Sequence, residues 1–170
     1  MLERGDDAFY FASSEKRTGA IAALDIAARE AEAEVETVDT EALTGSAIAQ
    51  AVGVKKLYEL GETKEAVAAK QLSAVTFADN SVLGMVVKGK LKKITKTDAV
   101  NVPLALDYIF TDCDKRFAFV LHSGMSEEEV FEFVASLKAE NGFDEVIAEP
   151  TSDVRLKAVG AKSATVYYFA

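Results

Sequence analysis

The sequence predicts an α/β protein whose sheet or sheets are mostly parallel and covered by helices. Short apolar runs typical of buried strands alternate with longer segments in which apolar residues recur every three or four positions. Polar or glycine-containing turns follow several of these runs. The clearest case is the continuous apolar run 117–121, which precedes the acidic segment 127–129, as in a buried strand that leads into a helix N-terminus.

The first half of the chain predicts two strands and three helices. Ser13 and Ser14 follow the first strand and are candidates to cap the alanine-rich helix after it. The next helix is expected to be interrupted or bent near Gly53 and to end at Gly61, and Thr63 is expected to cap the third helix. In chain order these are strand 8–12, helix 16–34, strand 35–38, helix 43–60 and helix 63–72.

The second half opens with a β-hairpin whose turn is marked by Lys88 and Gly89. This hairpin marks the expected boundary between two lobes, 1–80 and 81–170. The lobes are expected to pack on one another. The predicted elements are strands 75–77, 82–87 and 91–95, helix 98–112, strand 117–121, helix 126–141, strand 145–148 and strand 163–169.

Composition and charge limit the classes of partner. The 170 residues are 49% apolar and 28% charged, which suits a soluble protein with a substantial core. The net charge of −9 argues against a nucleic-acid partner, because phosphate binding needs clustered positive charge. A single cysteine favours a reducing compartment, and no apolar run is long enough for a membrane span. We therefore expect a soluble, cytoplasmic protein.

Three polar turns follow predicted parallel strands and are the candidate binding positions. In an open α/β sheet they would lie at the same carboxyl edge if their strands share a sheet. Hydroxyl groups, a glycine and helix N–H groups can together hold a carboxylate or a phosphate. The alternative is that these residues only cap helices. The turns are Ser13-Ser14 with Thr18-Gly19, Asp39-Thr40, and His122-Ser123-Gly124.

His122 is the only histidine of the chain, and three roles are open to it. It could bind an anion, accept a phosphoryl group or form a structural hydrogen bond at a strand end, because imidazole titrates near neutrality. No spacing marks an aspartate as its partner in a Ser-His-Asp triad. One histidine and one cysteine cannot build a zinc site, and neither a P-loop nor a dinucleotide motif is present. The sequence thus indicates no metal, no cofactor and no identifiable enzyme activity.

The only basic cluster lies in and after the predicted hairpin. It could contact an acidic partner protein or a lipid headgroup, or it could protect an exposed edge strand from pairing with another chain. The residues are Lys88, Lys90, Lys92, Lys93 and Lys96.

Several of these segments together resemble the DegV family of two-lobed α/β proteins that bind fatty acids. They are the strand followed by Ser13-Ser14 and Thr18-Gly19, the turn 38–40, the stretch 89–97, the turn 122–124 and the aromatic terminal strand 163–169. The resemblance implies non-enzymatic binding of a fatty acid or similar amphipathic anion in an apolar slot. It also implies that Ser13, Ser14, Thr18 and Gly19 hold the carboxylate.

Two alternatives remain. The segment His122-Ser123-Gly124 is similar to the phosphoryl-accepting turn of mannose-type phosphotransferase IIA proteins, which implies a phosphoryl carrier that uses His122. These three residues are also a possible second ligand site. The last alternative is a scaffold or assembly domain without a ligand, in which the polar turns serve only as caps.

Overall fold

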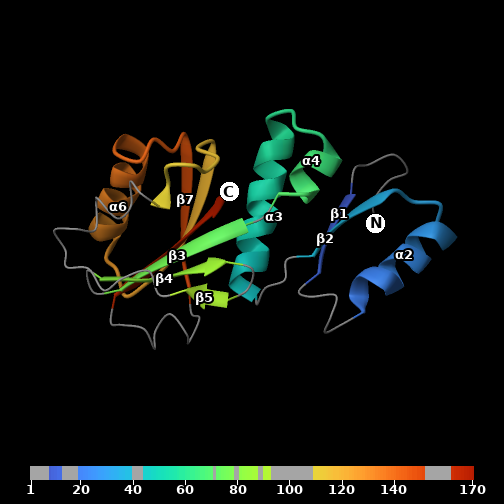
Figure 1. Ribbon diagram of the computed structural model, residues 1–170, viewed down its shortest axis with the longest axis horizontal. Helices are drawn as coiled ribbons and strands as arrows, with labels where there is room; N and C mark the ends of the chain where they lie inside the picture. The colour runs from blue at the N-terminus through green and yellow to red at the C-terminus, as the bar shows by residue number, and fades with distance from the viewer. Residues whose placement is uncertain are drawn as a thin grey trace. The chain divides into compact units, whose positions relative to one another are not determined.

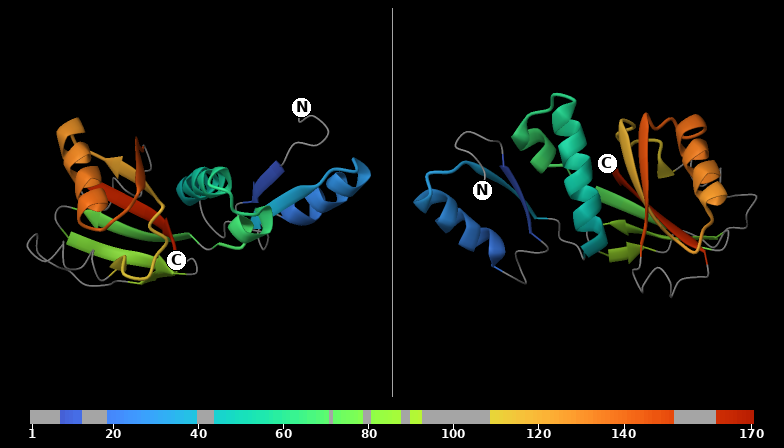
Figure 2. Two further views of the ribbon diagram at one scale, coloured as in Figure 1. Left: turned by 90° about the horizontal axis from the view of Figure 1, so that it is seen from above. Right: turned by 180° about the vertical axis from the view of Figure 1, so that it is seen from behind.

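The structure, a computed structural model, describes residues 8–12, 19–39, 44–70, 72–78, 81–87, 90–92, 109–151 and 162–170. Helices and strands alternate along much of the chain, so the predicted α/β class is confirmed. The chain forms two compact units, Met1–Lys70 and Gln71–Ala170. Figures 1 and 2 show the elements of each unit.

The first unit contains a two-stranded parallel sheet with helices on both sides (Figure 1). Strand β1 pairs with β2 along its whole length, from Ala8 opposite Val35 to Ala12 opposite Asp39. Helix α2 lies on one side of this sheet, and α3 and α4 lie on the other. The elements are β1 (Ala8–Ala12), α2 (Ala20–Glu30), β2 (Val35–Asp39), α3 (Thr44–Glu59) and α4 (Lys64–Ala68).

Helix α3 runs unbroken through Gly53, so the predicted interruption there is wrong. Glycine in a helix costs only about 1 kcal/mol relative to alanine. Burial of Ala49, Val54 and Leu57 on one face of α3 offsets that cost. The ring of Tyr58, near the end of the helix, packs edge-on against Phe9 of β1.

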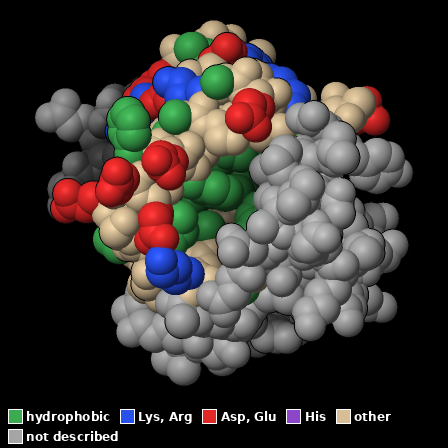
Figure 3. All heavy atoms as spheres, turned by 90° about the vertical axis from the view of Figure 1, so that its left-hand side faces the viewer, with side chains coloured by type: hydrophobic (Ala, Val, Ile, Leu, Met, Phe, Trp, Pro, Cys, Tyr) green, Lys and Arg blue, Asp and Glu red, His purple; other side chains and the backbone are tan. Residues whose placement is uncertain are grey.

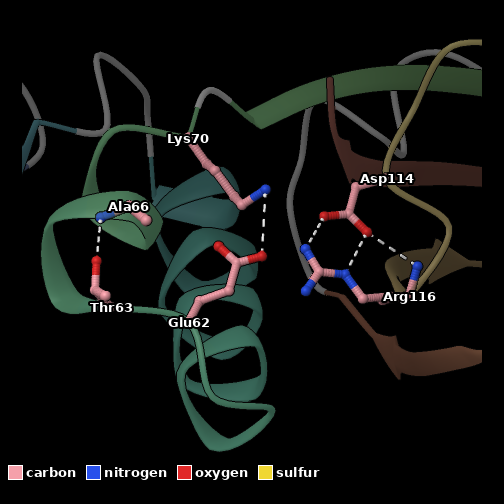
Figure 4. Close-up of polar contacts among 6 residues, drawn as sticks. All are labelled: Glu62, Thr63, Ala66, Lys70, Asp114 and Arg116. Carbon is pink, nitrogen blue, oxygen red and sulfur yellow. Dashed lines mark hydrogen bonds and ion pairs between the residues drawn. The ribbon is translucent and has the colours of Figure 1, made fainter.

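The ends of the other two helices differ from the predictions in position. Helix α2 begins at Ala20 rather than near residue 16, and its N-cap is Gly19. Helix α4 ends at Ala68 rather than near residue 72, because the chain enters a strand there. The predicted cap at Thr63 is confirmed, since its Oγ1 accepts a hydrogen bond from the Ala66 N–H at 3.2 Å (Figure 4).

The second unit is built on one six-stranded sheet with the order β5-β4-β3-β8-β6-β7. Only β6 and β7 pair in parallel, so the prediction of a mostly parallel sheet is wrong for this unit. The hairpin β4–β5 is confirmed, and β3 pairs with both β4 and β8. Strand β3 thus belongs to the second unit, whereas the expected boundary at residue 80 placed it in the first. The elements are β3 (Leu72–Ala78), β4 (Ser81–Val87), β5 (Lys90–Lys92), β6 (Phe117–Ser123), α6 (Glu127–Ala139), β7 (Glu145–Pro150) and β8 (Ser163–Phe169).

Two of the antiparallel pairs, β3–β8 and β6–β8, arise from the position of β8. This strand returns from the end of β7 into the middle of the sheet and separates β3 from β6. Burial is nearly continuous along β6 and β8, as expected for central strands covered on both faces. The predicted helix 98–112 and the segment 152–161 lie mostly or wholly outside the described residues.

Helix α6 covers one face of this sheet, and the main described core lies between them (Figure 2). Leu137 of α6 packs there against alternate residues of the central strands, including Val120 and Val166. Phe110 is fully buried and makes edge-to-face contacts with Phe143 and Tyr168, at centroid distances of 5.1 and 5.0 Å. Such contacts add about 0.5–1.5 kcal/mol each beyond the area that they bury.

The loop before β6 is fixed by charged groups at the end of the sheet opposite the candidate turn. The Asp114 N–H donates to the Phe169 carbonyl at 2.9 Å, and the Arg116 guanidinium binds both carboxylate oxygens of Asp114 (Figure 4). Lys115 donates to the Asn141 carbonyl at 2.7 Å, and its ammonium lies over the Phe143 ring. These contacts fix the position of the chain where β6 begins.

Candidate functional site

The two predicted turns of the first unit leave from the same edge of its sheet. Ala12 and Asp39, the last residues of β1 and β2, are register partners, so the parallel strands end side by side. Three predicted site residues, Ser13, Ser14 and Thr18, lie outside the described residues. Gly19 is described, and it directly precedes α2.

Gly19 adopts a left-handed conformation with φ of 58° at the N-cap of α2. A Cβ built there would meet no atom within 4 Å, so glycine is favoured by the backbone conformation and not by crowding. The first turn of α2 contains no acidic residue. The partial positive charge of this helix N-terminus is therefore not offset by a carboxylate of its own first turn.

Helix α2 is covered only in part. None of its described side chains is fully buried, and Ile21, Leu24 and Ala28 on one side of the helix are half-buried. On the other side of the helix, Ile26 is 60% exposed. Apolar surface is thus accessible along the helix that starts at the candidate turn.

The possible second site, His122-Ser123-Gly124, lies at the carboxyl end of β6. His122 is half-buried between its register partners Ala164 of β8 and Pro150 of β7. Its carbonyl accepts a hydrogen bond from the Thr151 N–H at 2.8 Å, which extends the parallel ladder past β7. Burial lowers the pKa of the His122 imidazole, and the nearby Glu149 carboxylate opposes this effect. Gly124, with φ of 73°, then turns the chain toward α6.

The N-terminus of α6 is already occupied by its own side chains. The Ser126 hydroxyl accepts from the Glu129 N–H, and the Glu129 carboxylate accepts from the Ser126 N–H at 2.8 Å, which forms a capping box. Lys162 forms an ion pair with the same carboxylate, and these donors lower the pKa of Glu129. Two more glutamates, Glu127 and Glu128, complete an acidic first turn.

This arrangement disfavours an anion beside His122. A phosphoryl group on the imidazole would add negative charge next to an acidic helix start whose cap is complete. No contact in the described residues favours the phosphoryl-carrier hypothesis.

A group of hydroxyls lies on the other face of the sheet, and Ser123 is its one predicted site residue. Ser123 is 9% exposed and lies opposite the buried Ser163 in the β6–β8 register. Two positions along β8, the hydroxyls of Thr165 and Thr76 lie 2.9 Å apart. In the sequence, Ser163 and Thr165 alternate with apolar residues and so indicate one polar strand face. That Ser123 and Thr76 lie beside them is visible only from the strand pairing.

Of the predicted lysine cluster, only Lys90 and Lys92 fall in a described element, the edge strand β5. An acidic partner for the cluster stays a prediction. The described residues contain no group of three or more His, Cys, Asp or Glu side chains placed to hold a metal ion. No helix in the described parts of the chain is long and apolar enough to cross a membrane.

No family model and no curated protein matches the chain. Several solved structures share its fold, and all three described below are DegV family or fatty-acid-binding proteins. The chain matches a DegV family protein from Eubacterium eligens loaded with heptadecanoic acid, at 14% identity and a TM-score of 0.65 over 98% of this chain and 74% of that one. A fatty-acid-binding DegV family protein from Thermus thermophilus matches at 20% identity and a TM-score of 0.61, over 99% and 72%. A Thermotoga maritima protein described by a fatty-acid-binding function matches at 19% identity and a TM-score of 0.55, over 97% and 70%.

These likenesses establish the fold. The chain has the α/β fold of the DegV proteins over nearly its full length, as the sequence resemblance implied. None of the structures compared above is a phosphotransferase protein.

Proposed function

We propose that this chain binds a fatty acid or a similar amphipathic anion and does not transform it. The shared fold supports this proposal, because DegV structures that match nearly the whole chain are described with bound fatty acids or a fatty-acid-binding function. A cytoplasmic location is proposed with it, on the basis of the single cysteine.

The carboxylate is assigned to the turn Ser13-Ser14, Thr18 and Gly19. The difference between the two helix starts that follow candidate turns supports this choice. The first turn of α2 carries no acidic residue, whereas the first turn of α6 carries three and has a complete capping box. A carboxylate is stabilised by helix N–H groups and by hydroxyl donors, and it is repelled by other carboxylates.

The acyl chain requires apolar walls with few polar groups. Helix α2 can form part of such a wall next to the turn, because its apolar surface is only partly covered. Ile21 and Leu24 are half-buried there. Each methylene of an acyl chain that leaves water contributes about 0.8 kcal/mol. A long chain can thus supply most of the binding free energy, with the turn fixing its orientation.

Native mass spectrometry after mild purification, followed by titration with oleate and palmitate, tests the proposal. We expect a copurified or readily bound fatty acid, and about tenfold weaker binding in Ser13→Ala/Ser14→Ala, the effect expected when hydrogen bonds to a charged group are lost. A purified protein that carries no lipid and takes up neither fatty acid would refute the proposal and leave the assembly-domain hypothesis.

A matched pair of glycine variants separates binding from stability. Gly19 and Gly142 both have positive φ, and neither has an atom within 4 Å of a built Cβ, so alanine imposes similar backbone strain of about 1–2 kcal/mol at each. We expect both variants to lower stability, but only Gly19→Ala to weaken oleate binding. Equal binding by the two variants would remove Gly19 from the proposed site.

A further inference from the structure

Phe131 is the most exposed of the large hydrophobic residues in the described part of the chain. It lies in the second turn of α6, and 74% of its surface is accessible. It is located on the face of α6 that points away from the core, since Leu137 and Phe133 occupy the packed face. Figure 3 faces the side where α6 lies and shows hydrophobic and acidic side chains next to one another on this surface.

Three exposed carboxylates lie near Phe131 along the helix. Glu127 and Glu128 lie one turn before it, and Glu132 follows it directly. None of the three forms an ion pair with another described residue, in contrast to Glu129, which binds Lys162. We call Glu127, Glu128, Phe131 and Glu132 the α6 acidic face.

The chain itself contains a segment of complementary chemistry. Residues 88–96 (K-G-K-L-K-K-I-T-K) hold five of the 19 lysines and arginines and no acidic residue, and two apolar side chains, Leu91 and Ile94, lie among the lysines. Part of the segment forms β5, which pairs only with β4 in the described sheet and is therefore an edge strand. An edge strand is open to a partner.

We propose that the α6 acidic face docks the lysine segment 88–96 of a second copy of this chain. The aromatic ring supplies a central apolar contact, and the glutamates around it select a basic partner and exclude acidic ones. Because the rest of the chain is strongly acidic, the lysine segment is the one basic cluster in the sequence that a second copy can offer. The contact is independent of the proposed fatty-acid site.

Sedimentation velocity of the full chain over about 10 µM to 1 mM tests the proposal at low salt, about 50 mM, where surface charges are weakly screened. We expect a reversible rise in mass from 18.2 kDa toward twice that value. Raising the salt to about 500 mM should weaken the association, and Phe131→Ala should weaken it about tenfold, as for a central aromatic contact.

Charge swaps identify the partner surfaces. Glu127→Lys/Glu128→Lys/Glu132→Lys should abolish association, as should Lys90→Glu/Lys92→Glu/Lys93→Glu, and an equimolar mixture of the two variants should form a heterodimer. Asp25→Lys/Glu30→Lys/Glu34→Lys changes the net charge equally at exposed positions of the first unit and should leave association intact. If lysines in the first turn of α6 disturb the helix, Glu127→Gln/Glu128→Gln/Glu132→Gln replaces the charge reversal and should weaken association.

A chain that stays monomeric to about 1 mM at low salt would overturn the proposal, because contacts weaker than that have little specificity. Association that survives both Phe131→Ala and the α6 charge reversal would also overturn it. If a free peptide of residues 86–97 binds the α6 acidic face while the chain does not self-associate, the face binds a different basic protein and the second-copy proposal fails.

Discussion

The hydroxyl pair Thr76–Thr165 gives a quantitative prediction about the second unit. The two oxygens lie 2.9 Å apart between β3 and β8, and Thr165 is only 5% exposed. Thr76→Val keeps the shape of the side chain but leaves the Thr165 hydroxyl without this partner in a site closed to water, which costs about 1–3 kcal/mol. Thr165→Val leaves the hydroxyl of Thr76, which is more exposed and can turn to water, so about 0.5–1.5 kcal/mol is expected.

The double variant should cost less than the sum of the two single changes, since it leaves no hydroxyl behind. We expect a coupling free energy of about 1 kcal/mol between the two positions, measured by urea unfolding followed by circular dichroism. Thr165→Ser is the control, because it removes a methyl group but keeps the hydroxyl. Additive single effects, with coupling below about 0.3 kcal/mol, would refute the claim that this contact contributes to stability.

Three further predictions follow from particular contacts. Phe110→Ala removes two edge-to-face contacts and leaves a cavity in the core, so the free energy of unfolding should fall by about 3–5 kcal/mol in a urea titration. Ser126→Ala removes the cap hydroxyl of α6 and should cost about 1 kcal/mol, with faster amide exchange confined to the first turn of the helix, whereas Ser126→Asp should retain most of the stability. The imidazole of His122 should titrate below 6.5 by NMR, because burial lowers its pKa. Since the folded-state pKa is below the unfolded one, the stability contribution of neutral His122 is present above about pH 6.5 and is lost as the pH falls through the folded-state value; His122→Gln should remove this dependence.

Local structure could be predicted well where one residue type determines the outcome. The strand 163–169 was predicted with the limits that β8 has, and Ser126 and Thr63 cap the helices that they were expected to cap. The hairpin at Lys88-Gly89 was confirmed because a two-residue turn constrains its neighbours strongly. For the two caps and the hairpin, the decisive interaction joins residues only a few positions apart.

Strand pairing could not be predicted in the same way. The apolar run of β6 is compatible with parallel or antiparallel neighbours, and nothing in its composition selects β8 as one of them. The hydroxyl pair Thr76–Thr165 joins residues 89 positions apart, so it is visible only once the sheet order is known. The uninterrupted course of α3 through Gly53 has the same origin, because packing of neighbouring residues outweighs the local preference of glycine.

The central position of β8 also affects how the second unit can be made in the cell. During synthesis, the β3–β4–β5 meander emerges from the ribosome well before β8, and β6 also precedes β8 in the chain. Strands β3 and β6 each expose an unpaired edge over that interval, since β8 is the strand that joins them in the described sheet. We expect sheet completion to be slow, because it waits for pairings of long sequence separation. Nascent chains are therefore most exposed to mispairing at these two edges, and chaperone binding there would protect them.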